Sequence, residues 1–220
     1  MSEFAFAWLD CEFGGLDPDA HDITEIALVL TDYRLAELAS GHWRVRFREE
    51  RSTPEAREIF GYDPALWADA VSIRQALGEI VALCGSGGAA GEAGEAPRVR
   101  DWKVVPAGQN VRMDVMFLER AFAACEIPSP FDYHVIDLAS VFYAWSLVAG
   151  EAVPALSLRQ AATTAGLIDG PVPHRALDDT RLTLETFRHY VGALALRETP
   201  APPPLRPEPT AEADAETTTR

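Results

Sequence analysis

Two carboxylates separated by one residue end an apolar segment near the start of the chain. Asp10 and Glu12 follow the run Phe4–Leu9, and Gly14-Gly15-Leu16 comes next. Alternate residues of a strand point to one face, so both acids would lie on the same side. Neighbouring carboxylates repel each other unless a hard cation such as Mg²⁺ or Mn²⁺ neutralises them. Solvated surface charge is the other interpretation, because the chain has 34 acidic residues.

A second acid lies at the start of an apolar helical pattern. Asp114 comes four positions after Asn110, within QNVRMDVMFL. Asn110 is typical of a helix N-cap, which would place Asp114 in the first turn. There the acid could complement the helix dipole, or it could be a ligand if other ligands lie close by.

A third cluster, HRALDD, precedes the last long apolar pattern. His174 could serve as a base with a pKa near neutrality, and Asp179 lies five positions later. Spacing alone also allows Asp178 as the ligand. Both acids could instead be charges at a helix start, and a lone histidine is more often structural.

Strands and helices must bring these clusters together. Period-two and continuously apolar patterns predict strands, the first three forming an antiparallel meander, at Phe4–Asp10, Thr24–Thr31, His42–Phe47, Lys103–Ala107 and His134–Leu138. Helical spacing or helix-end signals predict helices over Pro64–Leu83, Asn110–Ala124, from Leu138 to Val148, over Leu158–Ala165 before Gly166, and from about Arg175 to Leu196. The pattern is that of an α/β domain with a mixed sheet.

Composition limits the class of protein. With 220 residues, 48% hydrophobic, the chain can bury the core of one domain. A net charge of −15 argues against holding long duplex nucleic acid, which usually requires a basic surface. Divalent cations or a very short substrate would still allow action on a polyanion. Without a membrane-length apolar run or a signal-peptide pattern, we expect a cytoplasmic protein with no membrane partner.

Two segments are poor in apolar residues. Residues 197–220 are rich in Pro, Ala, Glu and Thr and are predicted to be a disordered tail after a domain at 1–196. Residues 85–101, with five glycines, are predicted to be a flexible insertion. The three cysteines Cys11, Cys84 and Cys125 form no CxxC pair, which favours reduced, buried thiols.

Taken in order, the three clusters resemble the motifs of the DEDDh, or DnaQ-like, family of 3′→5′ exonucleases. The resemblance extends from about Phe4 to Leu196 and rests on DCEFGGL, NVRMDVMFL and HRALDD. It has features of oligoribonucleases and of proofreading exonuclease subunits. It selects Asp179 over Asp178. Gly14, Gln109 and Met113 depart from residues frequent in the family, which are Thr, His and Phe, but no ligand is lost.

The resemblance implies a ribonuclease H-like fold, with a mixed five-stranded sheet flanked by helices. It implies that two divalent cations, Mg²⁺ or Mn²⁺, are held by four carboxylates, with His174 as the general base. Their positions here are Asp10, Glu12, Asp114 and Asp179. It also implies that Gly15, Leu16 and Asn110 contact the substrate, and that nucleoside 5′-monophosphates are released.

The expected partners are 3′ ends of single-stranded RNA or DNA, with RNA or short oligonucleotides favoured by the acidity of the chain. Members of the family are often homodimers, which the resemblance carries over as an expectation. One alternative is a proofreading or DNA-repair exonuclease that acts on single-stranded DNA within a complex. Another is a non-catalytic module on the same fold that binds nucleic acid or a protein partner.

Overall fold

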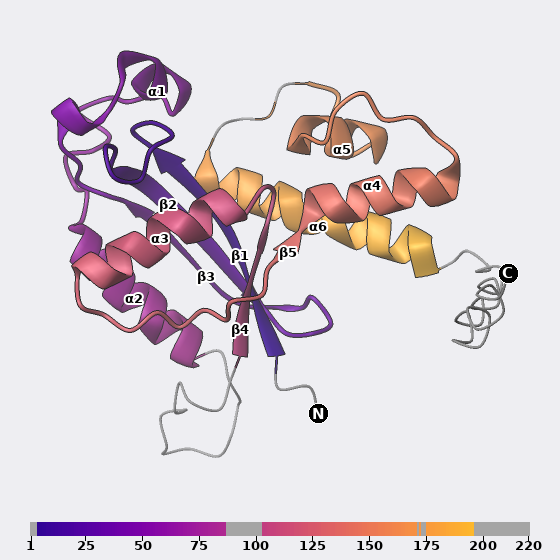
Figure 1. Cartoon of the computed structure of the whole chain (residues 1–220), viewed down its shortest axis with the longest axis horizontal. Coiled ribbons are helices and arrows are strands. Elements are labelled where there is room, and N and C mark those ends of the chain that lie inside the picture. Colours follow the sequence, from indigo (N-terminus) through magenta and orange to yellow (C-terminus); the bar gives the residue numbers. More distant parts are fainter. Residues whose placement is uncertain (1–3, 87–102, 171, 173–174, 196–220) are drawn as a thin grey trace, which may run out of the picture.

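The strand that carries the first acid pair lies in the middle of the sheet. β1 (Phe4–Phe13) pairs antiparallel with β2 (Ile23–Thr31) and parallel with β4 (Lys103–Gly108). β3 (Glu37–Arg44) adds antiparallel to β2, and β5 (Ile136–Asp137) adds parallel to β4. The order β3-β2-β1-β4-β5 is a mixed five-stranded sheet flanked by helices, which confirms the predicted α/β class (Figure 1).

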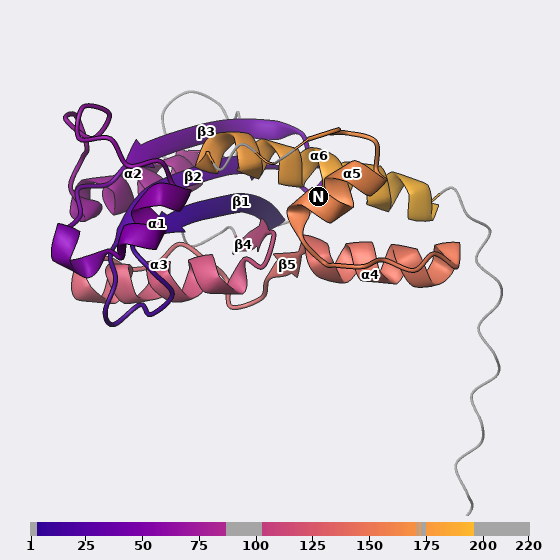
Figure 2. The ribbon, with the colours of Figure 1, turned by 90° about the horizontal axis from the view of Figure 1, so that it is seen from above.

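The computed structural model describes residues 4–86, 103–170, 172 and 175–195. Within these residues the helices are α1 (Pro54–Ile59), α2 (Ile73–Ser86), α3 (Arg112–Ala124), α4 (Leu138–Ala149), α5 (Leu158–Thr164) and α6 (Ala176–Ala195), with a 3₁₀ turn at Glu49–Arg51. α4, α5 and α6 lie together in both views (Figures 1 and 2).

Alternation along β1 divides the core into two. Leu9 and Cys11 belong to a buried cluster that includes residues of α2 and α3. Trp8 points to the opposite face and meets Phe187 of α6, with ring centroids 4.9 Å apart. The side chain of Asp10 points to the same face of β1 as that of Trp8, because alternate residues of a strand share a face. The acid pair therefore faces α6 and not α3.

Three predicted elements need correction, and one is the strand His134–Leu138, which is only Ile136–Asp137 because α4 begins at Leu138. The third strand is Glu37–Arg44, not His42–Phe47, and Val45 makes only an isolated bridge to Val71. The predicted helix Pro64–Leu83 begins only at Ile73. Asp63 starts a turn there, because its side chain accepts a 2.8 Å hydrogen bond from the backbone N–H of Ala65. The apolar Trp67 belongs to a separate small cluster with Phe60.

Helix α1 was not predicted, although its start has a clear signal. The Thr53 hydroxyl accepts a 3.1 Å hydrogen bond from the Ala56 N–H, and Pro54 follows directly after this cap. The prediction of Asn110 as an N-cap was wrong, because α3 begins at Arg112 and Asn110 is exposed with a φ of 54°. Asparagine tolerates this left-handed conformation better than most residues.

The two segments that are poor in apolar residues, 85–101 and 197–220, lie almost wholly outside the described residues. Gly85 and Ser86 are the last residues of α2, so the predicted insertion begins two residues too early. Its remainder, 87–101, and the predicted tail, 197–220, are not described. All three cysteines are free and buried, as predicted. Among the described helices, none has the length and apolar character to cross a membrane.

Candidate metal centre

Three carboxylates from distant parts of the chain meet beside the sheet. Asp10 and Glu12 come from the end of β1, and Asp179 comes from the first turn of α6. One ligand oxygen from each side chain lies within 4.8 Å of the other two. The structure therefore joins the first and third sequence clusters in one site, the metal cluster.

The structure also separates the two neighbouring acids of the third cluster. The side chain of Asp179 is buried, with 5% of its surface exposed, and belongs to the metal cluster. Asp178 is exposed and lies outside it. Helical geometry explains the difference, because successive residues of α6 point about 100° apart.

The fourth acid is tied to the same strand. Asp114 is buried, and its Oδ1 accepts a 2.8 Å hydrogen bond from the backbone N–H of Cys11. This contact places the start of α3 against the segment between Asp10 and Glu12. Asp114 is outside the group of three, but it is close enough to influence the pKa of Asp10.

Burial and mutual repulsion of the carboxylates disfavour the state in which all acids of the site are charged. Burial, followed by the charges of nearby carboxylates, raises the pKa of Asp10 well above its usual value. The same causes raise the pKa of Glu12 to about 8. Burial raises the pKa of Asp114 to about 7, although the Cys11 N–H opposes the shift. Oxygen donors that repel each other in this way fit a hard divalent cation, which would remove the repulsion.

Glu25 is an acidic neighbour that the sequence did not indicate. It is paired with Glu12 in the β1–β2 register, is 6% exposed, and its Oε1 is hydrogen-bonded to Nε2 of His42 on β3. The charge of Glu25 is a main cause, after burial, of the raised pKa of Glu12. Only the strand register could have revealed it, since TEIALVL has no distinctive spacing.

A cavity of about 370 Å³ lies over the metal cluster. Its lining includes Gln109 after β4 and Arg159 on α5, neither of which was predicted as a site residue. Gln109 donates from Nε2 to the Leu156 carbonyl at 2.6 Å, which connects the end of β4 to the segment before α5. Arg159 is exposed and gives the acidic cavity one cation.

The glycine loop after β1 is tightly packed. A Cβ at Gly14 would lie 2.4 Å from the Arg51 carbonyl oxygen, and one at Gly15 would lie 2.6 Å from the His21 ring. The threonine frequent in the family at position 14 would therefore clash with backbone. Leu16 is 78% exposed, and neither it nor Asn110 lines the cavity over the metal cluster.

His174, the predicted general base, lies outside the described residues. Arg175 and Ala176, which follow it, are described, and α6 begins at Ala176. Asp179 is thus in the first turn of α6.

Relatives by sequence extend over most of the chain. An oligoribonuclease from Xanthomonas oryzae pv. oryzae is 28% identical over 198 residues, which cover 85% of this chain and 89% of the relative. One from Alkalilimnicola ehrlichii is 29% identical over 194 residues, covering 86% and 89%. Both relatives are similar to this chain over most of its length, in agreement with the resemblance of its motifs to the DnaQ-like DEDDh family of 3′→5′ exonucleases. The motifs of this chain predict an enzyme of the hydrolase class, and the similarity to oligoribonucleases agrees with that prediction. No sequence model of a protein family matches it.

Solved structures agree with the fold of this chain. Exonuclease I of E. coli, in a zinc-bound complex with single-stranded DNA, superposes with a TM-score of 0.66 at 18% identity, covering 88% of this chain and 41% of the other. A second structure of exonuclease I, which suggests how that enzyme achieves processivity, superposes with a TM-score of 0.62 at 17% identity. The match covers 89% of this chain and 44% of the other. The chain thus spans about two fifths of these exonuclease I chains, and the ribonuclease H-like fold is confirmed.

Proposed function

We propose that this protein is a metal-dependent 3′→5′ exonuclease that releases nucleoside 5′-monophosphates from short single-stranded oligonucleotides, with RNA preferred. The observation that carries this proposal is the metal cluster, in which three carboxylate oxygens from β1 and α6 lie within 4.8 Å of one another. The oligoribonucleases that match most of the chain support short RNA as the substrate.

Asp10, Glu12 and Asp179 are proposed to hold one Mg²⁺ or Mn²⁺, and Asp10 together with Asp114, through water, a second. Such a pair of ions activates a water molecule and stabilises the charge of an in-line phosphoryl displacement. Burial of Asp114 and its hydrogen bond to Cys11 fix its carboxylate relative to β1 before substrate binds. This preorganisation keeps the ligands from having to rearrange during the reaction.

His174 is proposed to accept the proton of the attacking water. It lies five positions before Asp179 in the sequence, which is the spacing of the third family motif. An imidazole is suited to this role because its pKa is near neutrality.

The remaining contacts are proposed to orient the 3′ end. Gly15 would contact a nucleotide through its backbone, since the His21 ring takes the place of a Cβ there, and the exposed Leu16 offers an apolar surface to a base. Asn110 precedes α3 close to the second acid. Arg159 in the cavity lining is placed to attract a phosphate, which offsets the negative charge of the metal cluster.

A direct test uses a short RNA labelled at its 5′ end, incubated with the isolated chain. We expect stepwise shortening from the 3′ end with Mg²⁺ or Mn²⁺ and none with EDTA. A 3′-phosphorylated copy should resist cleavage, since a free 3′ end is required. Products that carry a 3′-phosphate, or cleavage within the strand, would contradict the proposal.

The substrate class is tested by comparing RNAs of two to five nucleotides, long single-stranded RNA and single-stranded DNA with matched 3′ ends. We expect the highest kcat/KM on the short RNAs. A preference for long DNA would support the DNA-exonuclease alternative, for which the fold neighbour solved with single-stranded DNA is the argument. Activity that appears only with added cell proteins would support action within a complex. Metal-dependent substrate binding without turnover would support a non-catalytic module.

A further inference from the structure

A larger cavity lies away from the metal cluster and takes no part in the proposed reaction. It has a volume of about 580 Å³ and contains none of the four proposed metal ligands. Its walls come from the loop after β1, the segment 45–51 after β3, the start of α2 and the last turns of α3. The loop that forms one wall therefore follows directly on the strand that carries Asp10 and Glu12.

This cavity, the arginine cavity, carries positive charge in an acidic protein. Its lining includes four arginines, Arg46, Arg48, Arg51 and Arg120, and two aspartates, Asp19 and Asp22. With His21 neutral, the lining has a surplus of two positive charges, whereas the whole chain carries −15. A cationic recess on such a protein favours an anionic ligand.

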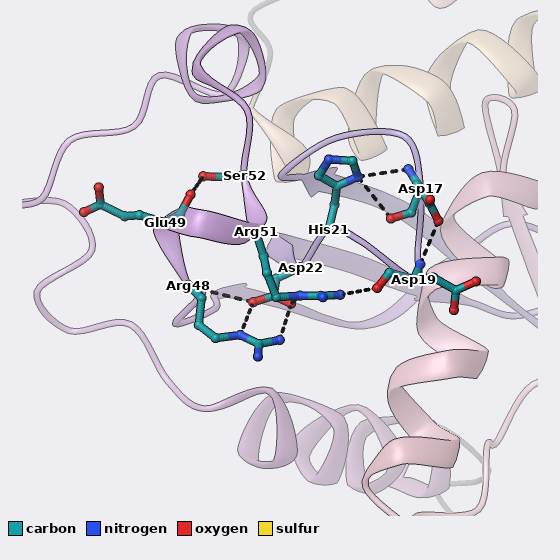
Figure 3. A network of polar contacts seen from close by, with 8 residues as sticks. All are labelled: Asp17, Asp19, His21, Asp22, Arg48, Glu49, Arg51 and Ser52. Carbon is teal, nitrogen blue, oxygen red and sulfur yellow. Dashed lines mark hydrogen bonds and ion pairs between the residues drawn. The ribbon is translucent and has the colours of Figure 1, made fainter.

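Two of these arginines are held in place by one aspartate. The Asp22 carboxylate accepts hydrogen bonds from Nε and Nη2 of Arg48, at 3.2 and 3.1 Å, and from Nε of Arg51 at 2.7 Å (Figure 3). Burial alone would raise the pKa of Asp22, but these arginines hold it below its usual value. The two guanidinium groups are thus oriented before a ligand arrives, which lowers the entropy cost of binding.

Hydrogen-bonding capacity remains on these side chains. Nη1 of Arg48 and Nη1 of Arg51 have no hydrogen bond to a described residue. The guanidinium of Arg46 donates from Nη2 to the Ala70 carbonyl, at 3.0 Å, and has no carboxylate partner in the described part of the chain. A planar guanidinium fork with free N–H groups matches the oxygens of a phosphate.

The floor of the arginine cavity is apolar. Ile23 and Val45 are buried, and Phe117 of α3 is 3% exposed, with Ala121 and Cys125 further along the same helix. A ligand that fills this space would place an apolar or planar body on the floor and an anionic group among the arginines. The volume is in the range of sites that bind small organic molecules.

We propose that the arginine cavity is a second, metal-independent binding site for a nucleotide, with the phosphate among the arginines and the base on the apolar floor. The choice of a nucleotide over other aromatic phosphates rests on the proposed function, which produces nucleoside monophosphates. The nucleotide could be the free product or a nucleotide of the bound strand. Both offer the same chemistry to the cavity.

The test measures binding of adenosine 5′-monophosphate to the full chain by calorimetry in EDTA. The variant Arg46→Gln/Arg120→Gln removes two cavity cations and leaves the Asp22 contacts intact. Arg34→Gln, which removes an exposed arginine of the β2–β3 turn outside the cavity, is the control. We expect the double variant to weaken binding by about 10-fold or more, since hydrogen bonds to charged groups are strong, and the control to match wild type.

The outcomes separate the two sources of nucleotide. Binding of the monophosphate that is lost in the double variant identifies the free product. If the monophosphate fails to bind but the double variant raises KM for a five-nucleotide RNA and not for a dinucleotide, the source is the strand. Neither effect, or equal binding of inorganic phosphate, would overturn the proposal. Binding in EDTA does not require turnover, so a chain that binds the nucleotide but hydrolyses nothing would refute only the proposed function.

Discussion

The Asp114 carboxylate accepts a 2.8 Å hydrogen bond from the backbone N–H of Cys11, the residue between Asp10 and Glu12. This contact joins residues 103 positions apart and fixes the start of α3 against β1. It gives Asp114 a structural role beside its proposed role as a ligand, so the two roles need separate tests.

Asp114→Asn separates those roles. The asparagine can still accept from the Cys11 N–H but has no charge, so the fold should be kept while turnover with Mg²⁺ falls about 100-fold, the order of effect seen when a carboxylate around a metal is lost. Asp114→Ala should also lower the melting temperature, because the buried N–H loses its acceptor. Steady-state kinetics and thermal melts measure both. Near wild-type kcat in Asp114→Asn would leave Asp114 with a structural role alone.

Stability without metal should fall as pH rises through neutrality. The pKa of Glu12 is raised to about 8 and that of Asp114 to about 7 in the folded chain. Between the usual carboxyl pKa near ~4 and these values, the folded state binds more protons than the unfolded state. The stabilisation is therefore complete at low pH and is lost as the pH approaches about 8.

Denaturant melts in EDTA between pH 5 and about 8 would measure this slope. Glu12→Gln should flatten it, and Mg²⁺ or Mn²⁺ should stabilise the protein more at the upper end of the range than at pH 5. Exposed Glu119, on α3 and outside the metal cluster, provides the control Glu119→Gln. If the free energy of unfolding changes with pH equally in Glu12→Gln and wild type, repulsion between Glu12 and its acidic neighbours does not destabilise the fold.

The threonine common in the family should not be tolerated at position 14. A Cβ at Gly14 would lie 2.4 Å from the Arg51 carbonyl oxygen, so Gly14→Thr should destabilise the fold by about 1–3 kcal/mol. Gly78→Ala is the control, because Gly78 is an exposed helical residue with open space around its Cβ position, and the change should stabilise by about 0.5–1 kcal/mol. Equal stability of Gly14→Thr and wild type in urea melts would contradict the close approach.

Loss of His174 should affect chemistry more than metal binding. His174→Ala is expected to lower kcat by roughly 100-fold or more, the usual contribution of a general base, while Mn²⁺ still raises the melting temperature as in wild type. His189→Ala changes an exposed histidine of α6 and should leave kcat unchanged. If the pH profile of kcat keeps its acidic limb in His174→Ala, another group is the base.

Much of the site could be predicted because its residues lie at element ends that the sequence marks. The apolar run before Asp10 and the helical pattern after Asp179 predicted β1 and α6. The resemblance of the three clusters, in their order, to the family motifs predicted that these acids lie in one site. Glu25 could not be found in this way, since its place beside Glu12 depends on the β1–β2 register. The arginine cavity was also missed, because its cations come from two segments, residues 45–51 and α3, with no common motif.

Errors in the fold have similar causes. Helix α1 is only six residues long, too short for a periodic pattern to appear. The third strand was shifted because Trp43 is the one buried residue of β3 and the others are exposed or half-buried, so the alternation in the sequence was weak. Asn110 was assigned as a cap from its residue type, whereas its backbone is in the left-handed region and α3 begins two residues later.

The central claim is tested most directly by comparing Asp179→Asn with Asp178→Asn. These neighbours on α6 differ in that Asp179 belongs to the metal cluster and Asp178 is exposed outside it. The measurement is the single-turnover rate of nucleotide release from a short RNA at saturating Mg²⁺. We expect a loss of about 100-fold or more in Asp179→Asn, with the fold retained, and a rate within about twofold of wild type in Asp178→Asn. A near wild-type rate in Asp179→Asn would contradict the metal centre.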